Sequence, residues 1–418
     1  MKISKSFFLI FSFFCMLFIC ACGSGGGSGG SSPDLGTLSL GLIDSAGSYE
    51  AVYVTVEEVQ VHLGGNENNH KNWQSIPMDT NTIDLCELTN GVREELGLTE
   101  LQSGHYTQMR LMLSATPEED EINIMSIEHP VANYVVIKNP LTEELTWEEL
   151  KVPSGFKTGV KLVKGFDIIE GETTEIIFDF DAARSVVQAG NSGNWHLKPT
   201  IKVLEESEGW IFTGIVKDDN DNGIPNAMVS VQEYNVGALD KKDEVKIRTA
   251  TITDSENTSV GQYEIFVAPG NYDVVAYKGP VIEGAFEHQD IFGPDCIEIS
   301  EDAESDDFIQ EFSLSNPPEN EFGIVTGVVT IPENGEELQY ATLSFRKQAE
   351  CFDNSGETVI EVVSINVGNG GEYTVYLPLL PNGEVYTIIA STEGEVTEEY
   401  LIDFTTDNPF PQNIDFSI

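Results

Sequence analysis

Apolar residues recur at every second position over long stretches of the chain. Leucines do so in residues 37–42, and valines do so in residues 51–56. A period of two predicts β-strands that bury one face. After the second stretch the apolar residues continue at Val59 and Val61, so the alternation slips by one residue. An extra residue at Glu57–Glu58 predicts a β-bulge, which shifts side chains without ending the strand.

Similar patterns predict further strands at residues 106–113, 134–138, 159–168 and 174–181. One short helix is predicted at Gly91–Leu96, with Asn90 as its cap and Gly97 as its stop. Short strands separated by polar turns are typical of a sandwich or barrel. We therefore assign residues 35–206 to one β-domain.

The rest of the chain contains an internal repeat. Four blocks recur in the same order, namely 213–216 with 326–329, 227–231 with 341–345, 261–265 with 371–375, and 272–276 with 386–390. The repeat predicts two similar β-sandwiches at residues 208–316 and 322–418. The segments 206–208 and 315–320 are the predicted joints, and we expect proteases to cut there.

The amino terminus has the pattern of an export signal. Lys2 and Lys5 precede a nearly continuous apolar run, residues 7–21, which is shorter than the roughly 20 residues of a spanning helix. The run ends in Ile19-Cys20-Ala21-Cys22, which resembles the bacterial lipobox. That resemblance implies cleavage after residue 21, so that residues 1–21 are a signal peptide, and lipidation of Cys22. A transmembrane anchor, or a conventional signal peptide cut elsewhere, is the alternative.

Residues 23–32 consist only of Gly and Ser, a composition typical of a flexible linker. Residues 22–34 are therefore predicted to be a lipidated tether that joins the body to a membrane. Gly23 stands where Asp would favour inner-membrane retention in enteric-type sorting. The predicted location is the cell envelope, on the outer membrane, at either its periplasmic face or the cell surface.

Acidic residues dominate the composition. The formal net charge is −49, with 21 basic residues against 70 acidic ones. This excludes nucleic acid as a partner, because binding phosphates requires Lys and Arg. The charge is interpreted as a source of solubility, and binding of divalent cations is the alternative.

Three cysteines remain beyond Cys22, and none has zinc-ligand spacing. Cys86 lies in the apolar run 83–88 and is expected to be a small buried hydrophobe. Whether Cys296 and Cys351 form a disulfide is left open by the sequence.

Two carboxylates stand out as candidate chemistry. Asp179 and Asp181 lie two apart in a predicted strand, so their side chains should leave the same face, at a separation of roughly 6.5–7 Å. That separation fits an inverting glycosidase. Arg184 offers an ion-pair partner, and the favoured interpretation is a structural ion pair at the strand end. Metal binding and catalysis are the alternatives.

Residues 218–223 resemble the first half of a calcium loop, with Asp218, Asn220 and Asn222 as ligands. However, Val229 stands at the twelfth position, where such a loop needs a bidentate Glu. The favoured interpretation is a β-turn, and weak calcium binding is the alternative.

The chain contains no HExxH motif, no GxSxG nucleophile elbow between a strand and a helix, and no phosphate-binding loop. The sequence therefore predicts no enzymatic activity and no cofactor.

The first domain resembles a bacterial domain of unknown function, number forty-three eighty-two. The resemblance covers most of residues 36–204 and rests on six motifs and a closing Leu197-Lys198-Pro199. The six motifs are at 36–40, 51–59, 84–91, 104–111, 152–155 and 179–185. Cys86 departs from the pattern, which has Leu there. The resemblance implies a secreted or lipid-anchored setting and no established chemistry.

The second domain resembles carboxypeptidase regulatory-like modules, which have a transthyretin-like sandwich. The matching segments are 214–216, 223–225, 227–229, 261–263 and 269–272. The third domain keeps the strand blocks but lacks the Gly-x-Pro turn. Such modules are mostly spacers or binding platforms, which implies the same here.

Together these features predict an all-β protein of three tandem β-sandwiches behind a lipoprotein signal and tether. The predicted function is a non-enzymatic binding or structural role at the cell envelope, with a glycan or an envelope protein as partner. A carbohydrate-binding lipoprotein is one alternative. A hydrolase that uses Asp179 and Asp181 is the more remote one.

Overall fold

The structure is a computed structural model. The residues that it describes are 34–45, 49–64, 73–138, 142, 144–152, 159–188, 194–206, 209–255, 258–279, 292–300, 308–315, 322–331, 340–351, 358–380, 384–392, 398–402, 412–413 and 416–417. Asp34–Ile418 forms one compact unit. The predicted signal peptide, Cys22 and the linker as far as residue 33 lie outside the described residues, as do residues 207–208 and 316–320 of the predicted joints.

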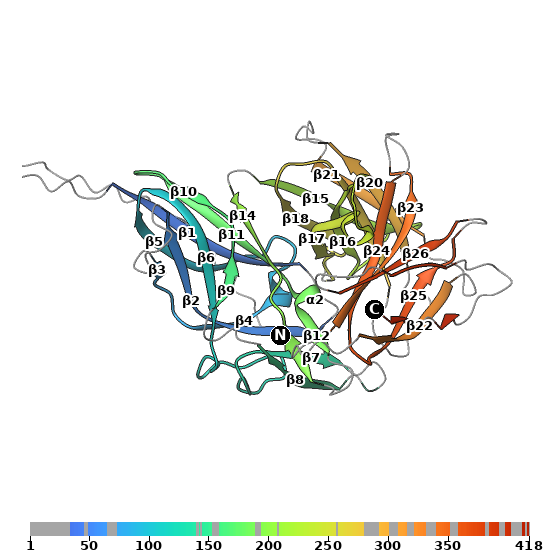
Figure 1. Cartoon of the computed structure of the whole chain (residues 1–418), viewed down its shortest axis with the longest axis horizontal. Coiled ribbons are helices and arrows are strands. Elements are labelled where there is room, and N and C mark those ends of the chain that lie inside the picture. Colours follow the sequence, from blue (N-terminus) through green and yellow to red (C-terminus); the bar gives the residue numbers. More distant parts are fainter. Residues whose placement is uncertain are drawn as a thin grey trace, which may run out of the picture. The chain divides into compact units, whose positions relative to one another are not determined.

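Nearly all regular structure is β, which confirms the predicted fold class (Figure 1). The strands of the first sandwich are β1 (Leu35–Ser45), β2 (Ala51–Leu63), β3 (Trp73–Ile76), β4 (Asn81–Asp84), β5 (Glu94–Gln102), β6 (Gly104–Leu113), β7 (Tyr134–Lys138), β8 (Leu145–Lys151), β9 (Val160–Leu162), β10 (Phe166–Ile168), β11 (Thr173–Asp181), β12 (Val186–Gln188), β13 (Trp195–Leu197) and β14 (Ile201–Glu205). The helical segments are the short 3-10 helices η2 (Leu85–Leu88) and η4 (Lys241–Asp243) and one α-helical turn, α2 (Ala182–Ser185).

The second sandwich contains β15 (Trp210–Asp218), β16 (Met228–Tyr234), β17 (Val245–Ile252), β18 (Gln262–Val267), β19 (Tyr272–Lys278), β20 (Phe292–Ile299) and β21 (Ile309–Leu314). The third contains β22 (Phe322–Thr330), β23 (Tyr340–Ala349), β24 (Thr358–Gly368), β25 (Glu372–Pro378), β26 (Tyr386–Ser391), β27 (Glu398–Ile402), β28 (Gln412–Asn413) and β29 (Phe416–Ser417).

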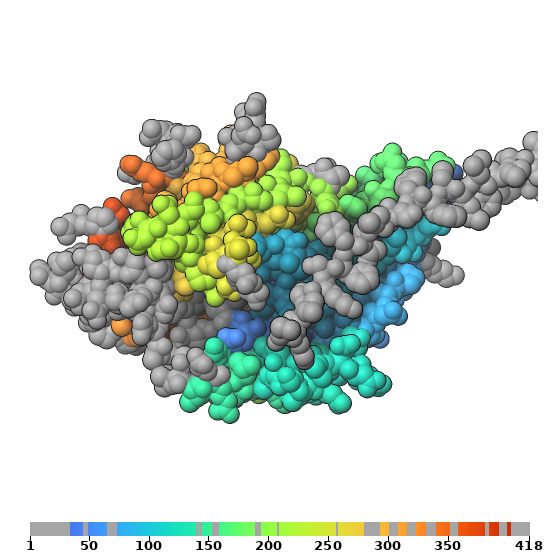
Figure 2. Space-filling view, turned by 180° about the vertical axis from the view of Figure 1, so that it is seen from behind, coloured from blue at the N-terminus to red at the C-terminus, as the bar shows by residue number. Residues whose placement is uncertain are grey.

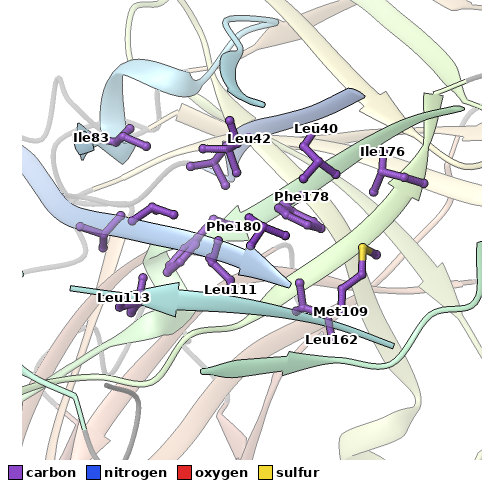
Figure 3. Packing of buried hydrophobic residues seen from close by; sticks show 14 of the residues in the cluster. Leu40, Leu42, Ile83, Met109, Leu111, Leu113, Leu162, Ile176, Phe178 and Phe180 are labelled. Carbon is purple, nitrogen blue, oxygen red and sulfur yellow. The ribbon is translucent and has the colours of Figure 1, made fainter. Parts of the chain in front are cut away.

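Two sheets enclose the core of the first sandwich. One has the order β14-β11-β1-β5, and the other runs β10-β6-β2-β7-β8-β13-β12 with β3, β4 and β9 paired alongside. Strand β1 pairs in parallel with β11 and antiparallel with β5. The alternating leucines of β1 are buried between the sheets, where they pack with Phe178 and Phe180 of β11 and Leu111 of β6 (Figure 3). The apolar face predicted from the period-two pattern is therefore the buried face of β1.

The predicted bulge in β2 is confirmed. The strand continues from Ala51 to Leu63, and its pairing with β6 shifts between Val56 and Glu58. The shift lets Val59 and Val61 return to the buried face, where both are fully buried. A bulge changes which side chains point to the buried face but does not end the strand, so one strand spans the whole apolar run.

The predicted helix at Gly91–Leu96 is wrong. Asn90 and Gly91 both have positive φ angles, 58° and 78°, so they turn the chain instead of capping a helix. The following residues form β5, which pairs with β1 and buries Leu96. Pairing along the edge of a hydrophobic sheet outweighs the local capping pattern here, because helices this short gain little stability on their own. The strand predicted at 159–168 is also divided, into β9 and β10.

The second and third sandwiches repeat one topology. The second has sheets β18-β15-β21 and β17-β16-β19-β20, and the third has β25-β22-β28, with β29 also on β22, and β24-β23-β26-β27. Each repeated sequence block lies on corresponding strands, and in both sandwiches the last strands pair in parallel with the first. Each sandwich has its own apolar core. The boundaries 35–206, 208–316 and 322–418 as independent folding units stay a prediction.

Asp84 makes the free energy of unfolding of the first sandwich depend on pH. Burial raises the pKa of Asp84 from 3.8 to about 6, and its Oδ1 accepts hydrogen bonds from the backbone N–H groups of Val52 and Cys86 at 3.2 and 3.1 Å. The folded state therefore holds a proton that the unfolded state releases between about pH 4 and 6, so stability falls as the pH rises through this window.

We expect Asp84→Asn to stabilise the protein at pH 7.5 by about 2 kcal/mol, because the amide oxygen keeps both acceptor roles without an ionisation cost. Urea unfolding from pH 4 to 8 measures this, and the variant should lose less stability across that range than the unmodified protein. Glu148→Gln, which makes the same kind of change on the exposed strand β8, serves as the control. An equal pH slope in Asp84→Asn and the unmodified protein would contradict the assignment.

Candidate functional site

A buried polar cluster joins all three sandwiches. This junction cluster consists of Arg184 from α2, Gln232 from β16, Ser344 and Arg346 from β23, and Glu361 from β24. Glu361 lies at its centre. Its backbone N–H donates to Gln232 Oε1 at 2.8 Å, and its backbone oxygen accepts from Gln232 Nε2 at 2.6 Å. The Gln232 amide therefore pairs with β24 as a neighbouring strand would.

The carboxylate of Glu361 connects the other members. Glu361 Oε1 accepts from Arg184 at 3.2 Å, and Glu361 Oε2 accepts from the Ser344 hydroxyl. Arg346 donates to Ser344 at 2.8 Å and to the Lys241 backbone oxygen of the second sandwich at 2.6 Å. Burial lowers the pKa of Arg346. Charges in such a position are stable only while each keeps its partners, so the cluster ties the sandwiches together.

The predicted ion pair of Arg184 with both Asp179 and Asp181 forms only in part. Asp181 caps α2, since its Oδ1 accepts from the Arg184 backbone at 3.0 Å, and the Arg184 guanidinium lies 3.6 Å from Asp181 Oδ2. Asp179 lies 3.9 Å from the Lys202 ammonium instead. Both carboxylates are buried, at 1% and 4% exposure. Carboxylates enclosed in this way do not present an acid and a base to a substrate, which disfavours the glycosidase interpretation.

A third carboxylate, Asp44, belongs to the same region. Its Oδ1 accepts from the Ala182 backbone at 2.9 Å, and its Oδ2 is buried without a hydrogen-bond partner among the described residues. Burial raises the pKa of Asp44 well above its ordinary value. A neutral carboxyl group here avoids the cost of a buried charge.

A cavity of about 270 Å³ lies between the first and second sandwiches. Its polar lining comes from Asp44, Asn90, Arg93, Glu206, Thr249, Thr251 and Glu264, and its apolar lining includes Ile43, Leu88, Ile177, Ile211, Ala250, Ile265 and Phe266. Strands β17 and β18, yellow in Figure 2, lie beside the blue-green part of the first sandwich on this face. Both sandwiches therefore contribute walls to one concave site.

The Asn90–Gly91 turn fixes one side of this cavity. The Asn90 backbone N–H donates to Thr251 Oγ1 at 2.9 Å, and Asn90 Oδ1 accepts from the Glu264 backbone at 2.5 Å. A Cβ atom on Gly91 would lie 2.3 Å from Glu264 Oε1, so the glycine leaves room for that carboxylate. The turn predicted as a helix cap is thus an attachment point to the second sandwich.

Arg93 is surrounded by carboxylates at the cavity. Its guanidinium lies 2.8 Å from Glu206 and 2.5 Å from Glu95. A hydrogen bond between Glu175 and Glu206 raises the pKa of Glu175 and lowers that of Glu206. Three carboxyl groups, those of Glu95, Glu175 and Glu206, therefore gather around one cation.

The loop at Asp218 is a turn closed by its own side chain. Asp218 Oδ1 accepts from the Asn220 and Asn222 backbones at 2.8 and 2.9 Å, and Oδ2 accepts from the Asn222 side chain at 3.0 Å. The hydrogen bond from the Asn222 side chain contributes most to lowering the pKa of Asp218. The three residues suggested as calcium ligands therefore bond to one another.

We expect calcium to raise the melting temperature no more than an ionic-strength-matched sodium control does, because the Asp218 oxygens already have donors. The test uses millimolar calcium and thermal unfolding of the unmodified protein and of the double variant Asp219→Asn with Asp221→Asn. A calcium-specific rise that the double variant loses would show that the loop is a cation site.

The cysteines differ in role. Cys296 of β20 and Cys351, which follows β23, form a disulfide, so the possibility left open by the sequence is realised. The bond connects the second sandwich to the third and packs with Val275 and Ile360 in a small shared core. Cys86 is free and half-buried against the core of the first sandwich, and burial raises the pKa of its thiol.

No metal-binding group was found among the described residues, where no three His, Cys, Asp or Glu side chains are arranged to hold an ion. Within the same residues, no helix has the length and apolar character to span a membrane.

One protein-family model matches the first sandwich. Residues 35–199 match the family described as "Domain of unknown function (DUF4382)". The resemblance predicted for this part of the chain is therefore confirmed. The resemblance of the second and third sandwiches to carboxypeptidase regulatory-like modules stays a prediction, and no curated protein matches the chain.

Several solved structures are similar to the chain at low identity. The Bacillus anthracis TIE protein is 14% identical, with a TM-score of 0.18, over 92% of this chain and 51% of that one, so this chain spans about half its length. The streptococcal ancillary pilin is 10% identical, with a TM-score of 0.17, over 91% and 98% of the two chains. A putative adhesin from Bacteroides ovatus is 13% identical, with a TM-score of 0.17, over 50% and 93%. Such TM-scores are too low to support a shared function.

Sequence reasoning missed the residues that join the sandwiches. Glu361 and Gln232 lie in ordinary strand patterns, and nothing local marks them as partners. Asn90-Gly91 did carry a signal, because this dipeptide is typical of turns with positive φ angles. Reading it as a turn would have placed the strand β5 correctly.

Proposed function

We propose that this protein is a non-enzymatic, lipid-anchored component of a bacterial cell envelope with a binding or structural role. The observation that carries the proposal is the sequence Ile19-Cys20-Ala21-Cys22, followed by ten residues of only Gly and Ser. Acyl chains on Cys22 would hold the protein at a membrane, and the linker would hold the body roughly 15–20 Å from the anchor.

The architecture of the body supports a structural or binding role. Three β-sandwiches are connected by the junction cluster and by the disulfide between β20 and the end of β23. The two carboxylates that suggested hydrolysis are buried and engaged with Lys202 and Arg184. A body built in this way is suited to present a surface at a fixed geometry. The outer membrane is the proposed location.

We expect Cys22→Ser to abolish lipid labelling and membrane association, because serine has no thiol for the lipid. Labelling cells with a radioactive or clickable fatty acid and fractionating them measures both effects. Cys20→Ser, in the same segment but outside the lipidated position, is the matched control and should keep both. Unchanged labelling and membrane recovery in Cys22→Ser would rule out this anchor.

Carbohydrate binding is the second candidate function, and one feature favours it. A groove of about 640 Å³ runs between β14 and the second sandwich, with Tyr234, Arg248 and Asn271 in its lining. Aromatic rings beside polar groups suit a sugar, which has apolar faces and hydroxyl groups. A glycan array probed with the detergent-solubilised protein and with Tyr234→Ala tests this candidate. Binding that is equal in both proteins would exclude the groove.

A further inference from the structure

The cavity between the first and second sandwiches combines apolar walls with an excess of carboxylates. Ile211 of β15 is 52% exposed although it lines the cavity, and Phe266 of β18 is only half-buried beside it. Large apolar side chains that remain accessible in a concave site provide a surface that an aliphatic chain can cover.

The charges around this cavity are unbalanced. Glu206 and Glu264 line it, and Glu95 and Glu175 lie next to Glu206 around Arg93. Arg93 is the one Lys or Arg among the lining residues. The acidic groups around the cavity therefore outnumber this cation. The local field therefore favours a positively charged group.

We propose that this cavity binds a primary ammonium group at the end of an aliphatic stem. The stem would lie against Ile211 and Phe266, and the ammonium would interact with the carboxylates of Glu206 and Glu264. The ring of Phe266 adds a favourable cation–π surface. Both sandwiches supply the site, so binding would also tighten their contact.

The size of the cavity sets the class of ligand. Its volume of about 270 Å³ lies just below the range of roughly 300–1,000 Å³ for pockets that enclose drug-sized molecules. One side chain fits such a space better than a folded peptide does. A lysine side chain of an envelope protein and the free amine of a diamino acid in peptidoglycan share this chemistry.

The inference deepens the binding role proposed above and does not depend on the anchor. Isothermal titration of the detergent-solubilised full-length protein with Nα-acetyl-lysine methylamide tests it. The matched probe is Nα-acetyl-norleucine methylamide, whose stem ends in a neutral methyl group. We expect the lysine probe to bind at least tenfold more tightly and to weaken with added salt. Equal binding of both probes, or binding of neither, would overturn the inference.

Variants locate the site. Glu264→Gln should weaken binding of the lysine probe severalfold, because it removes an exposed carboxylate of the cavity. The contact with Asn90 should remain, since Glu264 makes it through its backbone N–H and not through its side chain. Glu148→Gln on the exposed strand β8 makes the same charge change outside the cavity and should leave binding unchanged. Equal losses in the two variants would show that overall charge, and not this cavity, attracts the probe.

Two further ligands distinguish the sources. A lysine-containing peptide and a soluble peptidoglycan stem peptide with a free side-chain amine are titrated beside their side-chain-acetylated forms. Either amine-bearing ligand should bind more tightly than its acetylated form, and the tighter of the two identifies the source. Equal binding of the amine-bearing and acetylated forms would contradict the proposal, whereas an unmodified protein without lipid on Cys22 would contradict only the anchor.

Discussion

Replacing Glu361 by alanine is expected to lower the free energy of unfolding by about 3–5 kcal/mol. Glu361 is 7% exposed, and its carboxylate accepts from Arg184 and Ser344. Removing it takes the acceptor from the half-buried Arg184 guanidinium and from the buried Ser344 hydroxyl, and it removes the negative charge that favours the buried cation of Arg346. The loss should exceed that of an exposed ion pair because Ser344 and Arg346 are buried, at 4% and 2% exposure, and cannot replace the carboxylate with water. Urea unfolding followed by circular dichroism measures the difference.

Glu311→Ala is the control for this prediction. Glu311 also pairs with a cation, Lys217, at 2.9 Å, but its side chain is 64% exposed. An exposed pair of this kind contributes about 0–1 kcal/mol. If Glu361→Ala were no more destabilising than Glu311→Ala, the junction cluster would not hold the sandwiches together.

The second large effect is expected from the disulfide. Replacing both Cys296 and Cys351 by alanine should lower the free energy of unfolding by about 4 kcal/mol, the loop-closure value for cysteines 55 residues apart. The pair also contributes to the small core shared by the second and third sandwiches. Thermal and urea unfolding of the double variant, compared with the unmodified protein under oxidising conditions, measure the loss.

Cys86→Ala is the matched control, since Cys86 is free and closes no loop. It should cost less than the double variant, and a reducing agent should affect the unmodified protein but not the double variant. A double variant as stable as the unmodified protein in both conditions would contradict a stabilising cross-link.

Features that depend on alternation along one strand could be predicted from the sequence. The leucines of β1 and the bulge in β2 follow directly from which residues are apolar. The repeat predicted two sandwiches of one topology, because equivalent blocks occupy equivalent strands. These properties depend on neighbouring or regularly spaced residues, so they can be predicted from a single sequence.

Features that depend on contacts between distant residues could not be predicted. Asp179 was expected near Arg184, yet it pairs with Lys202, because β14 lies beside β11 and brings that lysine across. Glu361 and Gln232 are 129 residues apart, and no spacing rule relates them. The cavity is likewise formed by two sandwiches whose contact no local pattern describes.

Mass spectrometry of the amino-terminal peptide of the membrane-purified protein tests the central proposal most directly. The account predicts that the mature chain begins at Cys22 and that this residue carries a diacylglycerol on its sulfur, with the Gly/Ser run following it. A chain that begins at any other residue, or an unmodified Cys22, would contradict lipid anchoring.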